Sequence, residues 1–163
     1  WNAEALALTW DTLPAYLAVQ MRCDIHPEMV IRKYREWFPE LSPTEIMFKA
    51  TTAGRSWRGQ VEEADARARQ GAPTWVYQFE LPGAEIDRGA PHTIDIEHAF
   101  DNLKQTGAIS GTGPNHAGLP RWERHTLTHR ETMVFDANTR LENDPRRRER
   151  ELFSKVPFIQ WGT

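Results

Sequence analysis

The chain has 163 residues, of which 39% are hydrophobic and 26% charged, and its formal net charge is −3. It is long enough for one domain with a hydrophobic core, and its charge gives no reason to expect binding to nucleic acid or to an anionic membrane. The mean hydropathy of −0.66 indicates a soluble, globular protein. No apolar run approaches the roughly 20 residues that span a membrane. The single cysteine, Cys23, excludes a disulfide within the chain and is expected to be a buried structural thiol.

The first third of the sequence is predicted to be helical. A loose apolar pattern runs through residues 5–19, with Pro14 as a break or a first-turn residue. A second helix is predicted to start at Pro27 and to end before Pro39. The apolar positions of the two segments are Ala5, Leu6, Leu8, Leu13, Leu17 and Val19, followed by Met29, Val30, Tyr34, Trp37 and Phe38.

The clearest helix start lies at residues 42–45. Ser42 is the expected N-cap, Pro43 occupies the first helical position, and Glu45 completes a capping box. One apolar stripe follows, formed by Ile46, Ala50, Gly54, Trp57, Val61, Ala64 and Ala68. A single helix and two helices divided at Gly54 both fit this stripe, and Gly71 is the expected stop.

Two ion pairs are predicted on the outer side of this helix. Glu63 with Arg67, and Asp65 with Arg69, have the four-residue spacing and the order that favour pairing along a helix.

Two strands are predicted after the helical part. Residues 75–79 and 132–135 are rich in aromatic and β-branched side chains, residues 81–91 form a Gly/Pro loop, and Asp144-Pro145 is expected to start a charged helix. A two-stranded sheet is marginal alone, and bulky side chains on both faces require a sheet covered on both sides. The sequence therefore indicates an incomplete α/β domain.

His92 is the main candidate for chemistry. It lies on the Gly/Pro loop after a predicted strand, and an alternating segment, residues 93–100, follows it. A loop histidine past a strand can reach into a cleft, and imidazole suits general acid–base work. Asp95 is expected to brace the loop through backbone hydrogen bonds. The alternative is an ordinary surface histidine.

The segment from Ala90 to Phe100 resembles the histidine loop of type-B carboxylesterases, the family of para-nitrobenzyl esterases and cholinesterases. The shared pattern is His92, an acidic residue three positions later and an apolar pair at the end, although His98 stands where the family more often has an apolar residue. Other segments resemble bacterial members in the same order: residues 8–11, 50–60, 75–79, 114–120, 130–136 and 143–146.

The resemblance implies an α/β-hydrolase fold and ester hydrolysis through an acyl-enzyme, with His92 as the triad histidine and no metal or organic cofactor. The implied partners are a carboxylic ester substrate and the remaining segment of the same enzyme. The compartment is not readable: bacterial cytoplasm, periplasm and secretion all fit.

The chain departs from the family in what it lacks. It contains no G-x-S-x-G and no HGGG-type oxyanion loop, and Ser110 lacks the glycine that should precede a nucleophile. The triad carboxylate is expected upstream of Trp1. Gly113 abuts Pro114 where the family usually has a helix between the two motifs. We therefore expect residues 1–163 to be the carboxyl-terminal portion of a single α/β-hydrolase domain, inactive without the nucleophile-bearing segment.

Two other classes of protein stay open. One is a non-catalytic, cholinesterase-like binding module. The other is a metal-dependent hydrolase using His92, His98 or the pair His125/His129, which would chelate a metal only if it were helical.

Three further features have ordinary structural interpretations. The run 146–151 is expected to be a solvated helix face, and Trp10 and Trp57 are expected to pack in the core rather than line an acyl pocket. Ser56 lies inside a helical pattern without a nearby base.

Overall fold

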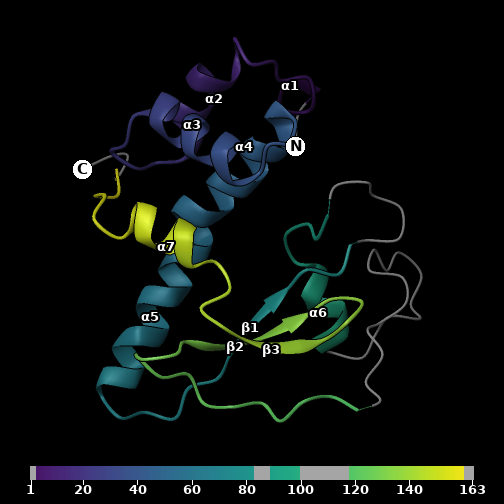
Figure 1. The fold of residues 1–163 in the computed structure, drawn as a ribbon, viewed down its shortest axis with the longest axis vertical. Helices are drawn as coiled ribbons and strands as arrows, with labels where there is room; N and C mark the ends of the chain where they lie inside the picture. Colours follow the sequence, from purple (N-terminus) through teal and green to yellow (C-terminus); the bar gives the residue numbers. More distant parts are fainter. Residues whose placement is uncertain (1–2, 83–88, 100–117, 160–163) are drawn as a thin grey trace. The chain divides into compact units, whose positions relative to one another are not determined.

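The computed structural model describes residues 3–82, 89–99 and 118–159, and the chain divides into two compact units (Figure 1). The first comprises residues 1–63 and 146–163, and the second residues 64–145. The predictions about Ser110 and about the junction of Gly113 and Pro114 lie outside the described residues. No helix in the described ranges is long and apolar enough to cross a membrane.

The elements, in chain order, are α1 (Ala3–Leu6), α2 (Leu13–Gln20), α3 (Pro27–Trp37), α4 (Pro43–Thr51), the π-helical segment η1 (Thr52–Trp57), α5 (Arg58–Arg69), β1 (Val76–Phe79), α6 (Ile94–Ala99), β2 (Glu131–Phe135), β3 (Arg140–Asn143) and α7 (Arg147–Phe153).

The local signals for helix ends are confirmed. Pro14 lies in the first turn of α2, and α3 begins at Pro27. The capping box of α4 is complete: the Ser42 hydroxyl accepts from the Glu45 N–H at 3.3 Å, and the Ser42 N–H donates to the Glu45 carboxylate at 2.8 Å. Gly71 has a φ of +75°, the left-handed geometry that favours glycine after a helix.

Gly54 does not divide the helical run that starts at residue 43. It lies in η1, where a side chain at this position would come within 3.2 Å of the Phe153 ring and 3.4 Å of the Cys23 sulfur. The absence of a side chain therefore permits close packing. Cys23 is buried, its thiol donates to the carbonyls of Met21 and Gly54, and burial raises its pKa. The prediction of a structural thiol is confirmed.

A buried charge network joins distant segments of the first unit. The Tyr34 hydroxyl donates to Glu149 at 2.8 Å, and the Arg146 guanidinium donates to both oxygens of the same carboxylate at 2.5 and 2.6 Å. Arg146 also donates to the Lys49 carbonyl and lies over the Trp57 ring. Burial, then the Glu149 charge, raises the pKa of Tyr34, so its hydroxyl stays a donor.

Two sequence predictions about this region were wrong. Residues 146–151 are not simply a solvated face, because Glu149 is 4% exposed and bonded to Tyr34. Asp144 does not cap the last helix, which begins at Arg147. Its φ is +50°, and its N–H donates to the Arg130 carbonyl at 3.2 Å, which extends the pairing of β2 with β3 by one residue.

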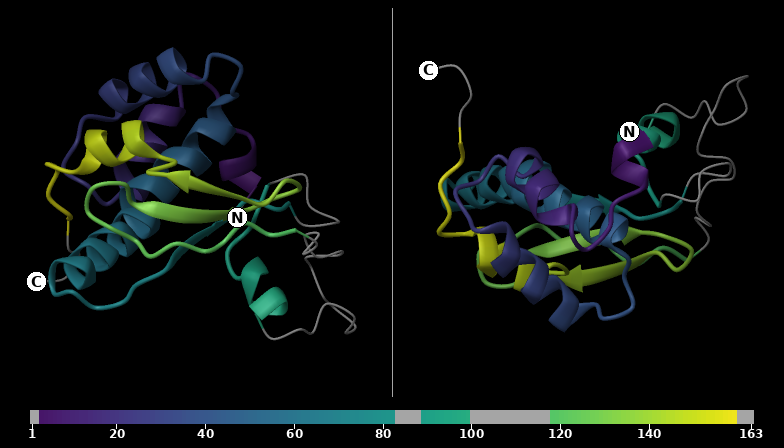
Figure 2. Two further views of the ribbon diagram at one scale, coloured as in Figure 1. Left: turned by 60° about the horizontal axis from the view of Figure 1, so that its bottom comes forward. Right: turned by 90° about the horizontal axis from the view of Figure 1, so that it is seen from above.

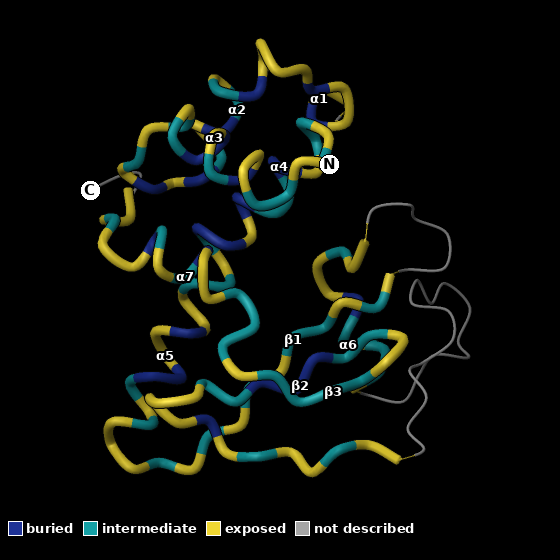
Figure 3. Tube along the Cα trace, in the orientation of Figure 1, coloured by how far each residue is buried: buried dark blue, intermediate teal, exposed yellow. Residues whose placement is uncertain are grey.

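The second unit contains a three-stranded mixed sheet of order β1-β2-β3 (Figure 2). β1 runs parallel to β2, with Tyr77 opposite Met133, and β2 runs antiparallel to β3. The central strand β2 is the most buried (Figure 3). The third strand, Arg-Leu-Glu-Asn, was not predicted because its composition is polar. The alternating segment after His92 is the short helix α6, with Ile94 buried.

Removal of the Tyr34 hydroxyl tests the network of the first unit. Tyr34→Phe is expected to lower the free energy of unfolding by about 2 kcal/mol, since the buried Glu149 carboxylate loses one donor. Urea denaturation followed by circular dichroism measures this. Tyr16→Phe is the matched control, because the Tyr16 hydroxyl makes no hydrogen bond to the described residues. Equal stabilities of the two variants would contradict the expectation.

Candidate functional site

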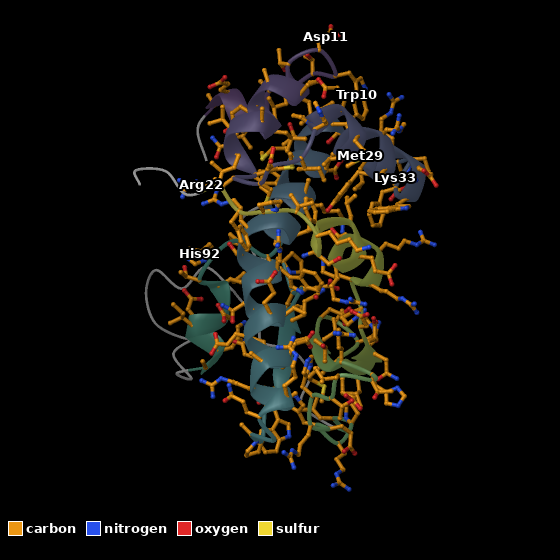
Figure 4. All side chains as sticks on the ribbon, turned by 90° about the vertical axis from the view of Figure 1, so that its left-hand side faces the viewer. Trp10, Asp11, Arg22, Met29, Lys33 and His92 are labelled. Carbon is orange, nitrogen blue, oxygen red and sulfur yellow. The ribbon has the colours of Figure 1, made fainter. Side chains whose placement is uncertain are left out.

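His92 lies on an exposed turn just before α6 (Figure 4). Thr93, the next residue, has a φ of +75°, an unfavourable conformation for a β-branched side chain. The turn closes with a hydrogen bond from the Ile94 N–H to the Pro91 carbonyl at 3.2 Å, and the Ile94 side chain is 2% exposed. Within the described residues, His92 itself has no hydrogen-bond partner.

Asp95 connects this turn to the sheet. The Tyr77 hydroxyl on β1 donates to the Asp95 carboxylate at 2.6 Å. The prediction that Asp95 braces the loop is only partly right, because Asp95 bonds to the Tyr77 side chain and not to the backbone of the loop. The hydrogen bond, followed by burial and the Asp95 charge, raises the pKa of Tyr77 to about 12.

Aromatic rings surround Tyr77. Its ring makes edge contacts with Trp122 and Phe135, whose centroids lie 6.2 and 6.0 Å away, and Trp122 donates its indole N–H to the Val76 carbonyl at 3.2 Å. Two residues along β1, Phe79 contacts the His98 ring at 4.7 Å. These contacts hold one face of β1 against α6 and against the segment that carries Trp122. Tyr77 was not a candidate from the sequence, where residues 75–79 were predicted only to form a strand.

His125 and His129 do not form the helical pair that could chelate a metal. Residues 127–129 form a turn, so the helical spacing that His125 and His129 need to share a metal is absent. His125 is buried, and its Nε2 lies 3.0 Å from an Asp65 oxygen. No group of three metal-ligating side chains occurs among the described residues.

The predicted pair of Asp65 with Arg69 was wrong. Asp65 is 8% exposed and accepts from Arg130 at 2.9 and 3.2 Å in addition to its contact with His125. Burial alone would raise the pKa of Asp65, but the hydrogen bonds from Arg130 and His125 outweigh it, and the pKa lies below its ordinary value. This cluster is structural: it joins α5 to the chain before β2.

Neither tryptophan singled out in the sequence lies fully in the core. Trp10 is 41% exposed, so the prediction of core packing was wrong for it, and Arg35 lies 4.5 Å from its ring centroid. Trp57 is half-buried beneath Arg146, and Ser56 is exposed.

Comparison with solved structures identifies similar proteins. A structure of the Geobacillus stearothermophilus carboxylesterase EST55 at pH 6.2 superposes with a TM-score of 0.62 at 27% identity, covering 78% of this chain and 32% of that one. A structure of the same enzyme at pH 6.8 superposes with a TM-score of 0.64 at 25% identity. It covers 90% of this chain and 34% of that one. An esterase from Clostridium hathewayi that hydrolyses aliphatic aromatic polyesters gives 0.55 at 21% identity, covering 95% and 34%, which shows fold alone.

These neighbours are α/β-hydrolase esterases. They confirm the resemblance predicted from the motifs: the chain is similar in structure to carboxylesterases such as EST55. The chain spans about a third of the length of the solved carboxylesterases that it matches. No protein-family model matches it, and no curated protein matches it significantly.

Replacement of the buried carboxylate tests the cluster of the second unit. Asp65→Asn is expected to lower the free energy of unfolding by roughly 3 kcal/mol near neutral pH, because Arg130 and His125 lose their anionic partner. The folded-state pKa of Asp65 is depressed, so its contribution is present above the ordinary value of 3.8 and is lost as the pH falls through the folded value.

Urea denaturation between about pH 3 and 7 measures both effects. The difference between wild type and Asp65→Asn should shrink toward the acid end. Asp11→Asn is the control, since Asp11 is exposed. A pH-independent difference would argue against the ion-pair cluster.

Proposed function

We propose that this chain is the carboxyl-terminal part of a serine carboxylesterase and that His92 is its triad histidine. The observation that carries the proposal is the likeness to a carboxylesterase at 27% identity, together with a histidine on an exposed turn within the segment that resembles the histidine loop. The proposal covers carboxylic esters as the substrate class.

In the proposed mechanism a serine from the remaining segment attacks the ester carbonyl carbon. As the new C–O bond forms, His92 accepts the serine proton, and backbone N–H groups of the remaining segment hold the oxyanion. His92 then donates that proton to the departing alcohol, leaving an acyl-enzyme. Water attacks the acyl carbon, gives its proton to His92 and releases the carboxylic acid as the proton returns to the serine.

The environment of His92 supports this role. A catalytic base needs one nitrogen for the nucleophile and the other for an orienting carboxylate. His92 is exposed and has no partner within the described part of the chain, so both nitrogens can meet groups from elsewhere.

The sheet supports the proposal of a remaining segment. β1 pairs with β2 alone among the described residues, which leaves the polar backbone groups along its other edge without a strand partner there. Trp75, just before this strand, and Tyr77 on it are 50% and 46% exposed. Large aromatic side chains beside an open strand edge favour a neighbouring strand and a covering layer.

The proposed role of His92 is tested in the complete polypeptide. His92→Ala is expected to lower kcat for a para-nitrophenyl ester by at least ~10³-fold, because the serine loses its base. His129→Ala, which removes an exposed histidine from the same unit, should keep the full rate. A full rate in His92→Ala would overturn the assignment.

Peptide mapping of the denatured sample tests the remaining segment. Mass spectrometry is expected to find a G-x-S-x-G peptide, either on a second polypeptide or on one chain that also contains His92. If 18.9 kDa is the only species and it hydrolyses esters, the mechanism is wrong, because this chain has no such motif. If it is the only species and is inactive, the binding-module interpretation replaces the esterase.

A further inference from the structure

We propose that Tyr77 is a positioning residue for His92, acting through Asp95 to hold the turn that carries the histidine against the sheet. This inference rests on the proposed function, because it assigns Tyr77 a part in the reaction only if His92 is the base. Tyr77 does not touch the reacting atoms in this scheme.

The first support is the rigidity of the donor. Tyr77 lies in β1, where it pairs in register with Met133 of the buried strand β2. Its ring makes edge contacts with Trp122 and Phe135, which support the ring on one side although the residue is 46% exposed. The donor–acceptor distance of 2.6 Å is typical of a hydroxyl bonded to a charged carboxylate.

The second support is the weakness of the turn on its own. α6 has six residues, too few for a helix that is stable without tertiary contacts. Thr93 adopts a φ that β-branched residues avoid, and such a conformation persists only where surrounding contacts impose it. Asp95 is three residues after His92 and therefore transmits the position of β1 directly to the turn.

The third support is that this contact is directional. Among the contacts that join α6 to β1 are the Tyr77–Asp95 hydrogen bond and the packing of His98 on Phe79. Tyr77 and Phe79 lie on one face of the strand, since they are two residues apart. The ring contact is non-directional, so the hydrogen bond sets the orientation of the turn.

The hydroxyl also keeps its proton over the range in which an esterase works. Because the pKa of Tyr77 is raised to about 12, the tyrosine donates to Asp95 at neutral and moderately alkaline pH. Deprotonation of Tyr77 therefore does not make the rate of the proposed esterase depend on pH near neutrality.

The experiment compares Tyr77→Phe, Asp95→Asn and the double variant in the complete polypeptide. Tyr77→Phe is expected to lower kcat about tenfold or more with little change in KM, because a misplaced base slows chemistry without weakening substrate binding. Asp95→Asn should lower kcat less, since its amide oxygen still accepts from the Tyr77 hydroxyl but carries no charge. The double variant should be no slower than Tyr77→Phe, since no contact is left for Asp95→Asn to weaken. Tyr16→Phe is the matched control, and its kcat should equal that of the wild type.

A second measurement reports the contact without using activity. Ultraviolet titration of tyrosinate should show a transition near pH 12 that Tyr77→Phe lacks and that Asp95→Asn moves down toward the ordinary value of 10. The pKa of Tyr77 should fall in Asp95→Asn because the Asp95 carboxylate disfavours the tyrosinate anion. Asp95→Asn keeps the side-chain size, so it remains informative if Tyr77→Phe does not fold.

The outcomes separate the two claims. If His92→Ala is inactive and Tyr77→Phe and Asp95→Asn keep the wild-type kcat, the positioning role is overturned and the proposed function stands. If His92→Ala is fully active, the proposed function fails, whatever the titration shows. Equal losses in kcat and in folded fraction, measured by near-ultraviolet circular dichroism, would reduce Tyr77 to a structural residue and would also overturn the inference.

Discussion

A buried carboxylate must be matched by hydrogen-bond donors, and each unit of this protein is built around one. In the first unit Glu149 meets Tyr34, 115 residues away in the sequence, and Arg146. In the second unit Asp65 meets Arg130, 65 residues away. Each carboxylate therefore joins segments that no local interaction brings together. The packing of the remaining apolar core of the first unit is not directional, whereas these hydrogen bonds are.

Helix boundaries were predictable because their causes are local. The capping box at Ser42 and the glycine stop at Gly71 need only neighbours in the sequence, and both are present. The buried carboxylates were not predictable for the opposite reason. Asp65 has a well-spaced arginine four residues on, so local reasoning paired it along its own helix, while its true partners lie across the unit. β3 was missed because its register comes from β2 rather than from its own composition.

The candidate site shows the same difference between features with local causes and features that depend on distant partners. His92 stood out because a histidine on a Gly/Pro loop is a local pattern with a chemical meaning. Tyr77 did not, because an aromatic residue in a strand is ordinarily read as packing. Only the fold shows that its hydroxyl lies 2.6 Å from Asp95, and that the residue predicted to brace the loop does so through this side chain. A residue that acts through a distant partner leaves no mark in a single sequence.

The division of the proposed enzyme has a structural consequence. A base and a nucleophile supplied by separate segments must be positioned relative to each other to within a fraction of an ångström for proton transfer to be fast. The turn at residues 91–94 is short and strained, so contacts with a neighbouring strand are needed to hold His92 in one position. In the proposed enzyme the contact that holds it is the hydrogen bond from Tyr77 of β1 to Asp95 of α6.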